Sequence, residues 1–395
     1  MFDPKINRRT GLTLFGAGLA SAALSGCGGL PGFDSGPTAA PTPGGGSGPV
    51  PAGGVPVGLL VPLTGGGQGG VVGNALKNAA EMALAEFQGA NVRLIVKDDR
   101  GSADGARQAA QEALAEGAEI VLGPLFAPSV QAAASVVRPA GRPMIAFSSD
   151  ASVAAPGVYM MSFPAEGDVS RILAYAAGQG RRSFAALIPD TAYGRVVEAA
   201  FQQVAAQRGL RVVGIERYPL DQVRLGEAAT KLSGVFNQID ALFLPEQPDA
   251  LPTVGSVLAG VNLNIQRVKL LGTGVWNDMR VFRVPQLQGG WFAAPDSAGF
   301  NAFAARYQQR FGAPPTRLAS VSYTAVTLVA ALARQQGSAR FSEQVLTNPS
   351  GFEGVDGLFR FRPDGQIERG LAVLEVRNGT AVTISPAPRE FGRSA

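Results

Sequence analysis

The sequence predicts two consecutive α/β domains, each built on an open and mostly parallel β-sheet. Short runs of apolar residues alternate along the chain with segments whose apolar side chains recur at helical spacing. This alternation occurs in two successive series, and each series is long enough to bury a hydrophobic core of its own. Helices that connect parallel strands cover both faces of the sheet, so the predicted fold class is α/β with two doubly wound domains.

The first series begins with a continuous apolar run at residues 57–61, which is typical of a strand buried on both faces. The spacing of apolar side chains then predicts a helix over residues 74–87. The later elements of this series are strand 92–97, helix 104–116, strand 120–122, helix 129–138 and strand 143–147. Four strands are therefore expected in the first sheet.

The second series starts with a helix and continues in the same pattern. Its elements are helix 166–177, strand 184–189, helix 195–207, strand 211–218, helix 226–236, strand 241–244 and strand 269–271. A further strand at 290–293 and long helices at 299–311 and 319–335 follow. We also expect a hairpin of residues 358–361 against 371–376, with its turn at Pro363-Asp364-Gly365.

The first 27 residues are typical of a signal peptide, with a basic start followed by an apolar run that is short for a permanent membrane helix. The run ends in Leu24-Ser25-Gly26-Cys27, which resembles a bacterial lipobox and makes Cys27 the predicted lipid anchor. Arg8 and Arg9 fit a twin-arginine signal or a general secretory signal, so the export route stays open. Residues 28–54 are almost entirely Gly, Pro, Ala, Ser and Thr, which predicts a flexible tether.

Composition excludes several kinds of chemistry. The 395 residues include one Cys and no His, so triads with His, imidazole catalysis, an internal disulfide and the usual zinc sites are ruled out. The net charge is only +4, and the basic residues form no block that would bind nucleic acid. We therefore expect a binding protein and not an enzyme, with no cofactor and no metal.

Five sequence segments resemble the Leu/Ile/Val-binding, type I periplasmic binding protein family. They are Leu59-Leu60-Val61-Pro62-Leu63-Thr64-Gly65, Gly123-Pro124-Leu125, Pro143-Met144-Ile145-Ala146-Phe147-Ser148, Asp190 with Tyr193-Gly194, and Gly354-Val355-Asp356-Gly357-Leu358-Phe359-Arg360-Phe361. The resemblance implies two domains joined by three crossovers, near 160–161, near 291 and between 336 and 345. The implied domains are 55–160 plus 291–338 and 161–290 plus 339–385, with a tail at 386–395.

Hydroxylic and small residues follow the strands of the first predicted domain, beside expected helix starts. Such groups suit a carboxylate or another anion. In the family that the chain resembles, matching loops hold the α-carboxylate of the ligand, and Ser129 is equally well explained as a helix N-cap. The candidate ligand-binding residues are Thr64, Phe126, Ser129, Ser148 and Ser149.

Three further candidates follow strands of the second domain: Tyr193, Glu246 and Trp276. The two aromatic residues are equally compatible with packing, and Glu246 with a solvated surface carboxylate. Amino-acid binders of the family usually carry an acid in a Gly-x-Glu-Gly-like loop, where this chain has Gly272-Thr273-Gly274-Val275-Trp276. The absence of that acid leaves open whether the ligand is a free amino acid.

The resemblance implies a periplasmic, lipid-anchored protein on the inner or outer membrane of a bacterium. It would capture an amino-acid-like or other small anionic solute in an interdomain cleft for ABC-type uptake. The Gly123-Pro124-Leu125-Phe126 segment also resembles lipoprotein activators of penicillin-binding proteins, whose partner is a peptidoglycan synthase. An NAD-dependent oxidoreductase is a remote alternative, because residues 65–70 match G-x-G-x-x-G between a strand and a helix.

Overall fold

Residues 53–89 and 91–392 are described by the structure, which is a computed structural model. The predicted signal peptide, the lipid anchor Cys27 and nearly all of the predicted tether lie outside these residues. The described chain forms α/β layers around two main sheets.

Five parallel strands of the described chain form the first sheet, in the order β2-β1-β3-β4-β5. They are β1 (Val55–Val61), β2 (Val92–Asp98), β3 (Ile120–Leu122), β4 (Met144–Ala146) and β5 (Val158–Met160). The prediction of four strands was one too few, because β5 is only three residues long and shows no readable periodicity.

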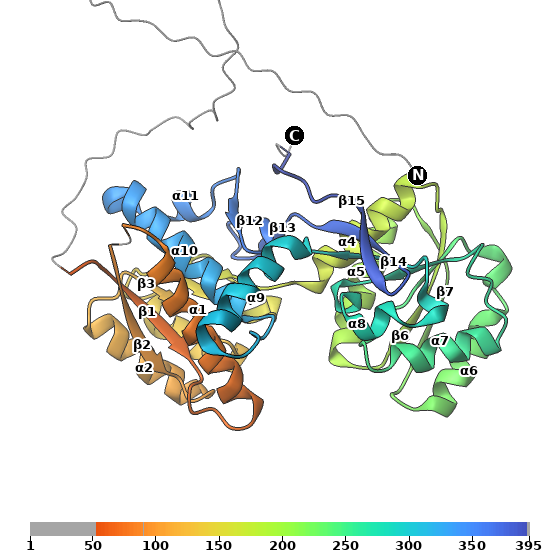
Figure 1. The fold of residues 1–395 in the computed structure, drawn as a ribbon, viewed down its shortest axis with the longest axis horizontal. Helices are drawn as coiled ribbons and strands as arrows, with labels where there is room; N and C mark the ends of the chain where they lie inside the picture. The colour runs from red at the N-terminus through yellow and green to blue at the C-terminus, as the bar shows by residue number, and fades with distance from the viewer. Residues whose placement is uncertain (1–52, 90, 393–395) are drawn as a thin grey trace, which may run out of the picture. The chain divides into compact units, whose positions relative to one another are not determined.

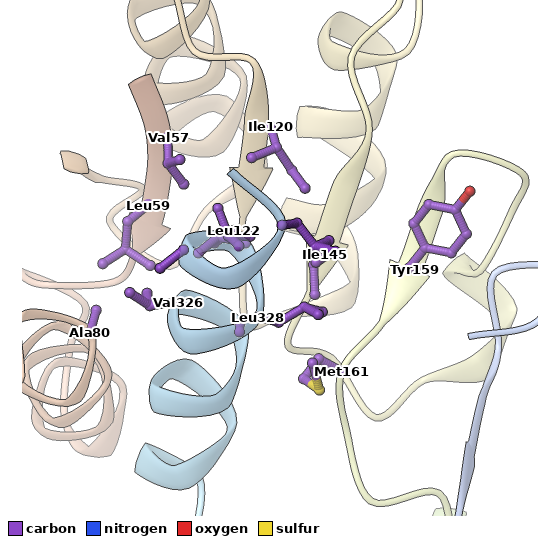
Figure 2. Close-up of a cluster of buried hydrophobic side chains, with 14 of the residues drawn as sticks. Val57, Leu59, Ala80, Ile120, Leu122, Ile145, Tyr159, Met161, Val326 and Leu328 are labelled. Atoms are coloured by element: carbon purple, nitrogen blue, oxygen red, sulfur yellow. The ribbon is translucent and has the colours of Figure 1, made fainter. Parts of the chain in front are cut away.

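Helices cover both faces of this sheet because alternate residues of a strand point to opposite sides. The helices of the first domain are α1 (Gln68–Glu86), α2 (Ala103–Ala115), α3 (Ala127–Val137), α9 (Ser297–Phe311), α10 (Ala319–Gln335) and α11 (Glu343–Leu346), of which α9 packs on α1 and α10 and not on the sheet. Leu59 of β1 is buried with α1 and α10, whereas the next residue, Leu60, is buried with α2 and α3. Figure 1 shows α1 and α10 beside β1, and Figure 2 shows Leu59 close to Val326 of α10.

Seven strands form the second sheet, in the order β15-β14-β10-β9-β8-β6-β7. They are β6 (Ser183–Pro189), β7 (Arg211–Tyr218), β8 (Ala241–Phe243), β9 (Lys269–Gly272), β10 (Trp291–Ala294), β14 (Ala372–Arg377) and β15 (Thr380–Ser385). The five strands from β6 to β10 are parallel, and β14 and β15 extend the sheet in antiparallel pairs.

The second sheet is also covered on both faces. Its helices are α4 (Ala165–Gly178), α5 (Ala192–Gln207), α6 (Gln222–Ser233), α7 (Leu251–Gly260) and α8 (Met279–Phe282). Phe201 of α5 stacks on Phe243 of β8 with ring centroids 5.3 Å apart, in a core shared with α4. Leu225 of α6 and Leu251 of α7 are buried in the core on the other face. Both sheets are therefore doubly wound.

The strand that starts at Trp291 belongs to the second sheet, which corrects the expectation that it joins the first domain. Trp291 pairs with Leu271 of β9 in parallel and with Glu375 of β14 in antiparallel register. All four residues of β10 are buried, as expected for a strand in the interior of a sheet, and β10 lies between β9 and β14. The chain returns to the first domain only after Ala294, where α9 begins at Ser297.

The predicted hairpin of 358–361 against 371–376 is wrong, although the turn at Pro363-Asp364-Gly365 is confirmed by the bond from Gly365 N–H to the Arg362 carbonyl. A third, antiparallel sheet consists of β11 (Phe352–Gly354), β12 (Gly357–Phe361) and β13 (Ile367–Arg369). Phe359 and Phe361 are buried in the core of the first domain. Residues 339–369 therefore pack with the first domain and not with the second, since their apolar face is buried there.

Replacing Phe359 with Ala tests this placement. The side chain is fully buried, so the variant should lose about 3–5 kcal/mol of the free energy of unfolding. Urea unfolding followed by circular dichroism measures the change. Val223→Ala, at a residue that is 69% exposed, is the matched control and should stay within about 0.5 kcal/mol of the parent. An equally small loss for Phe359→Ala would contradict the packing of β12 in this core.

Candidate functional site

The loops at the carboxyl ends of the first sheet surround a hollow of about 500 Å³, called here the first hollow. Parallel strands bring their carboxyl ends to one edge of a sheet, and such an edge is where ligands of open α/β sheets bind. The lining residues come from the start of α1, the loops after β3 and β4, the crossover after β5 and the start of α10. They include Gln68, Val72, Phe126, Phe147, Ser148, Ser149, Phe163 and Leu318.

Three of the predicted ligand-binding residues line the first hollow. Ser148 is 4% exposed, and its hydroxyl oxygen accepts a hydrogen bond from the Asp150 N–H at 3.2 Å. Ser149 is exposed on the same loop, and Phe126 is 38% exposed directly before α3. A hydroxylic loop and an exposed aromatic ring therefore share this hollow.

Thr64 and Ser129 lie elsewhere. The Thr64 hydroxyl donates to the Asp98 carboxylate at 2.5 Å, which links the ends of β1 and β2. Ser129 is the third residue of α3 and is fully buried, so a solute in the first hollow does not reach it. The N-cap of α3 is Phe126, which also corrects the alternative interpretation of Ser129 as the N-cap.

A second hollow, of about 580 Å³, lies at the carboxyl ends of the second sheet. It is called here the second hollow, and residues from both domains line it. The second domain contributes Asp168, Tyr193, Asn277, Asp278, Met279 and Phe282, and the first contributes Phe300, Asn301 and Arg317. Phe163, in the first crossover, lines both hollows.

Tyr193 is the predicted second-domain residue that the structure places at a hollow. It lies at the start of α5, and its hydroxyl is 2.6 Å from the Thr273 hydroxyl oxygen after β9. Burial raises the pKa of Tyr193 well above its usual value, so the phenol stays protonated and can donate or accept a hydrogen bond.

Glu246 and Trp276 do not face either hollow. Glu246 is 2% exposed and accepts hydrogen bonds from the Tyr218 hydroxyl and the Gln247 N–H, so it is not a solvated carboxylate. Trp276 is fully buried, and its indole N–H donates to the Leu244 carbonyl at 3.0 Å. Both side chains stabilise the second domain, and both predictions of ligand contact are corrected by this burial.

The Gly-rich segment 65–70 is explained by close packing between a loop and the start of α1. A Cβ at Gly70 would lie 2.7 Å from the Gly65 carbonyl oxygen, and one at Gly73 would lie 2.4 Å from the Pro62 carbonyl oxygen.

The order of strands in the first sheet, β2-β1-β3-β4-β5, also differs from the usual order of a dinucleotide-binding sheet. Among residues 53–89 and 91–392 no cluster of three or more His, Cys, Asp or Glu is suited to a metal ion.

Comparison with known families identifies the architecture. The model of a family described as Periplasmic binding protein matches residues 54–381. The chain belongs to this family. The predicted resemblance to Leu/Ile/Val-binding, type I periplasmic binding proteins is thus confirmed, together with the mixed α/β fold of two domains. Membership implies a periplasmic location and a small-molecule ligand for proteins of this kind.

Solved structures of similar fold come from several bacteria. A protein from Rhodospirillum rubrum, assigned as a branched-chain amino acid ABC transporter, has a TM-score of 0.75 at 22% identity, over 84% of this chain and all of its own. A solute binding protein from Rhodopseudomonas palustris in complex with 3,4-dihydroxybenzoic acid has a TM-score of 0.60 at 23% identity. The match covers 86% of this chain and 98% of that protein. A substrate-binding protein from Desulfitobacterium hafniense in complex with Leu has a TM-score of 0.61 at 20% identity. The match covers 84% of this chain and 99% of that protein.

No curated protein matches this chain by sequence. None of the helices in the described part of this periplasmic binding protein is long and apolar enough to cross a membrane.

Asp168 is a residue of this binding protein that the sequence analysis missed. It lies on α4 just after the first crossover, lines the second hollow, and accepts a hydrogen bond from the Gly274 N–H at 2.8 Å. Burial raises the pKa of the Asp168 carboxyl to about 7, although the bond from Gly274 opposes this shift. Its position on α4, directly after a crossover between the domains, is the sequence signal that could have indicated it.

The pKa of Asp168 predicts how stability depends on pH. An unfolded Asp titrates near pH 3.9, so between about pH 4 and about pH 7 the folded state holds a proton that the unfolded state has lost. The free energy of unfolding should therefore fall as pH rises through this window. In Asp168→Asn the amide oxygen can still accept the hydrogen bond from the Gly274 N–H, but the side chain no longer titrates. The free energy of unfolding of this variant should therefore fall less over the same pH window.

Urea unfolding of both proteins across this pH window measures the difference. Asp99, whose pKa burial raises to about 6, contributes a fall of the same sign in both proteins, so it cancels in the comparison. If the free energy of unfolding falls with pH by the same amount in the parent and in Asp168→Asn, the raised pKa of Asp168 is contradicted.

Proposed function

We propose that this periplasmic binding protein captures a small amino-acid-like or other anionic solute between its two domains and presents it to an ABC-type importer. The observation that carries the proposal is the composition of the second hollow. Phe300, Asn301 and Arg317 of the first domain line it together with Tyr193 and Asn277 of the second. A solute bound there contacts both domains at once, so binding favours their closure about the crossovers.

The side chains around the hollows fit a solute with one polar end and one apolar end. Ser148 and Ser149 offer hydroxyls at the first hollow, and hydroxyl donors suit a carboxylate. Phe163, Phe282 and Phe300 offer aromatic surface at the second hollow, which suits an aliphatic or aromatic group. Binding and release of such a solute need no reaction, so the proposed function is non-enzymatic and uses no cofactor.

Two of the structural neighbours support this solute class. One holds Leu and another holds 3,4-dihydroxybenzoic acid, and each of these molecules joins a carboxylate to an apolar body. Their identity to this chain is 20% and 23%, so they support a class of solute and not a particular one. The proposal therefore covers branched-chain amino acids and aromatic acids.

We also propose that Cys27 anchors the protein to a bacterial membrane through a lipid, with residues 28–54 as the tether. The lipobox-like segment Leu24-Ser25-Gly26-Cys27 supports this part of the proposal. Activation of a penicillin-binding protein is the second candidate function. It is favoured by the Gly123-Pro124-Leu125-Phe126 segment, whose Phe126 is exposed at the first hollow.

Isothermal titration of the purified protein with leucine, isoleucine, benzoate, 3,4-dihydroxybenzoate, a muropeptide and NAD tests the proposal. At least one of the amino or aromatic acids should bind. The double variant Ser148→Ala with Ser149→Ala should bind it about tenfold more weakly or worse, because hydrogen bonds to a carboxylate are lost. Ser256→Ala, a helix residue that lines neither hollow, is the matched control and should bind like the parent.

Two outcomes would contradict solute capture, and one would contradict only the role of the first hollow. Binding that is insensitive to the double variant would exclude the first hollow as part of the site. No binding of any solute, together with co-purification of a penicillin-binding protein, would favour the activator. Binding of NAD alone would favour the oxidoreductase.

A further inference from the structure

The chain passes between the two domains once more after β15. Three earlier passages follow β5, β10 and β13. β15 is an edge strand of the second sheet, and residues 386–391 continue from its end. This segment is called here the strap, because its two ends contact different domains.

The first end of the strap is fixed to the second domain. Ala387 packs against the core that β14, α6 and α7 share. The guanidinium of Arg171, on α4, donates to the Ser385 hydroxyl at 2.7 Å and to the Pro386 carbonyl at 3.4 Å. The Nε of Arg171 also donates to the Leu371 carbonyl at 2.9 Å, in the passage after β13. One side chain of α4 thus holds the start of the strap and the end of the third passage.

The other end of the strap contacts the first domain. The Cζ of Arg360, on β12, lies 4.5 Å from the centre of the Phe391 ring. Arg360 is held in place by an ion pair of 2.7 Å with Glu368. A Cβ at Gly351 would lie 2.8 Å from Cε2 of Phe391, so the ring lies directly against this glycine. Four residues after Ala387, the chain is therefore in contact with the other domain.

The strap has limited freedom to follow a movement of the domains. Pro386 and Pro388 have a fixed φ, and segments rich in proline are extended and semi-rigid. Pro388 also packs on the third passage, because a Cβ at Gly370 would lie 3.2 Å from its Cγ. A movement that separates the two ends must straighten the bend at residues 389–390 or break the contacts of Phe391.

We infer that the strap is a fourth link between the domains, which restricts their hinge motion, and that Phe391 attaches it to the first domain. Rotation of the domains away from the arrangement in the structure must stretch the strap or separate Phe391 from Arg360. A single cation–π contact is weak, so the attachment is reversible. It shifts the populations of domain arrangements and does not fix one of them. The inference goes beyond solute capture and does not depend on which solute binds.

The distance between two spin labels tests this inference. The labels are placed on two exposed residues, by Gln111→Cys on α2 and Val223→Cys on α6. The full chain also carries Cys27→Ser, so that no other thiol is labelled. Double electron–electron resonance without solute gives the distribution of distances between the domains. In Phe391→Ala the share of molecules outside the main peak of the parent should rise about threefold or more.

Deletion of residues 386–395 should cause at least the same rise, because it removes the whole strap. Two further variants separate attachment from a general disturbance of the tail. Phe391→Tyr keeps an aromatic ring for Arg360 and should reproduce the distribution of the parent. Glu390→Ala changes an exposed strap residue that forms no ion pair with the described residues, and it should also match the parent. Circular dichroism of each variant shows that it is folded.

An unchanged distance distribution after deletion of residues 386–395 would overturn the inference. A change in the deletion variant with none in Phe391→Ala would overturn the role of Phe391. The same change in Glu390→Ala as in Phe391→Ala would overturn it too, since the effect would then not come from the contact with Arg360. Solute capture, measured by titration, is untouched by any of these results.

Discussion

The ring of Phe163 contacts two guanidinium groups: the Cζ atoms of Arg317 and Arg369 lie 4.8 and 4.5 Å from the ring centre. Each contact of this kind contributes about 0.5–2 kcal/mol, depending on how far water is excluded. Arg317 is paired with the buried carboxylate of Asp356, and Arg369 donates to the Ser162 carbonyl at 2.6 Å. Phe163 lines both hollows, so these contacts fix a ring that the two hollows share.

The two halves contribute different chemistry. The first hollow carries the hydroxyls of Ser148 and Ser149, which suit the carboxylate of a solute. The second hollow carries aromatic surface, the neutral phenol of Tyr193 and the carboxylate of Asp168. A solute that contacts both hollows would meet the hydroxyls of the first and the aromatic surface and phenol of the second. Under the proposed function, recognition depends on the approach of the two domains, because a ligand that contacts both favours their closure.

The order of strands and helices was predictable because runs buried on both faces and helical spacing are local properties of the chain. The position of Ser148 and Ser149 at the first hollow was predictable for a related reason, since parallel strands bring their carboxyl-end loops to one edge of the sheet. The burial of Trp276 could not be predicted from the local sequence. Its indole ring fills space that is free only because residues 272 and 290 are glycines, since a Cβ at either position would clash with the ring. The pairing of strands also could not be predicted, because it depends on contacts between distant parts of the chain. The pairing of β10 with β14 and of β13 with β12 are the two examples. Asp168 was missed because its hydrogen bond joins α4 to a loop that is 106 residues away in the sequence.

The proposed function requires loops of both domains to form one binding site around Phe163. Hydrogen–deuterium exchange of the full protein, with and without a saturating amount of the solute that binds most tightly, tests this requirement most directly. We expect slower exchange in the loop after β4, residues 147–150, and in the loop after β9, residues 272–279, in the same experiment. Slower exchange in one of these loops alone, with the other unchanged, would contradict a site shared by the two domains.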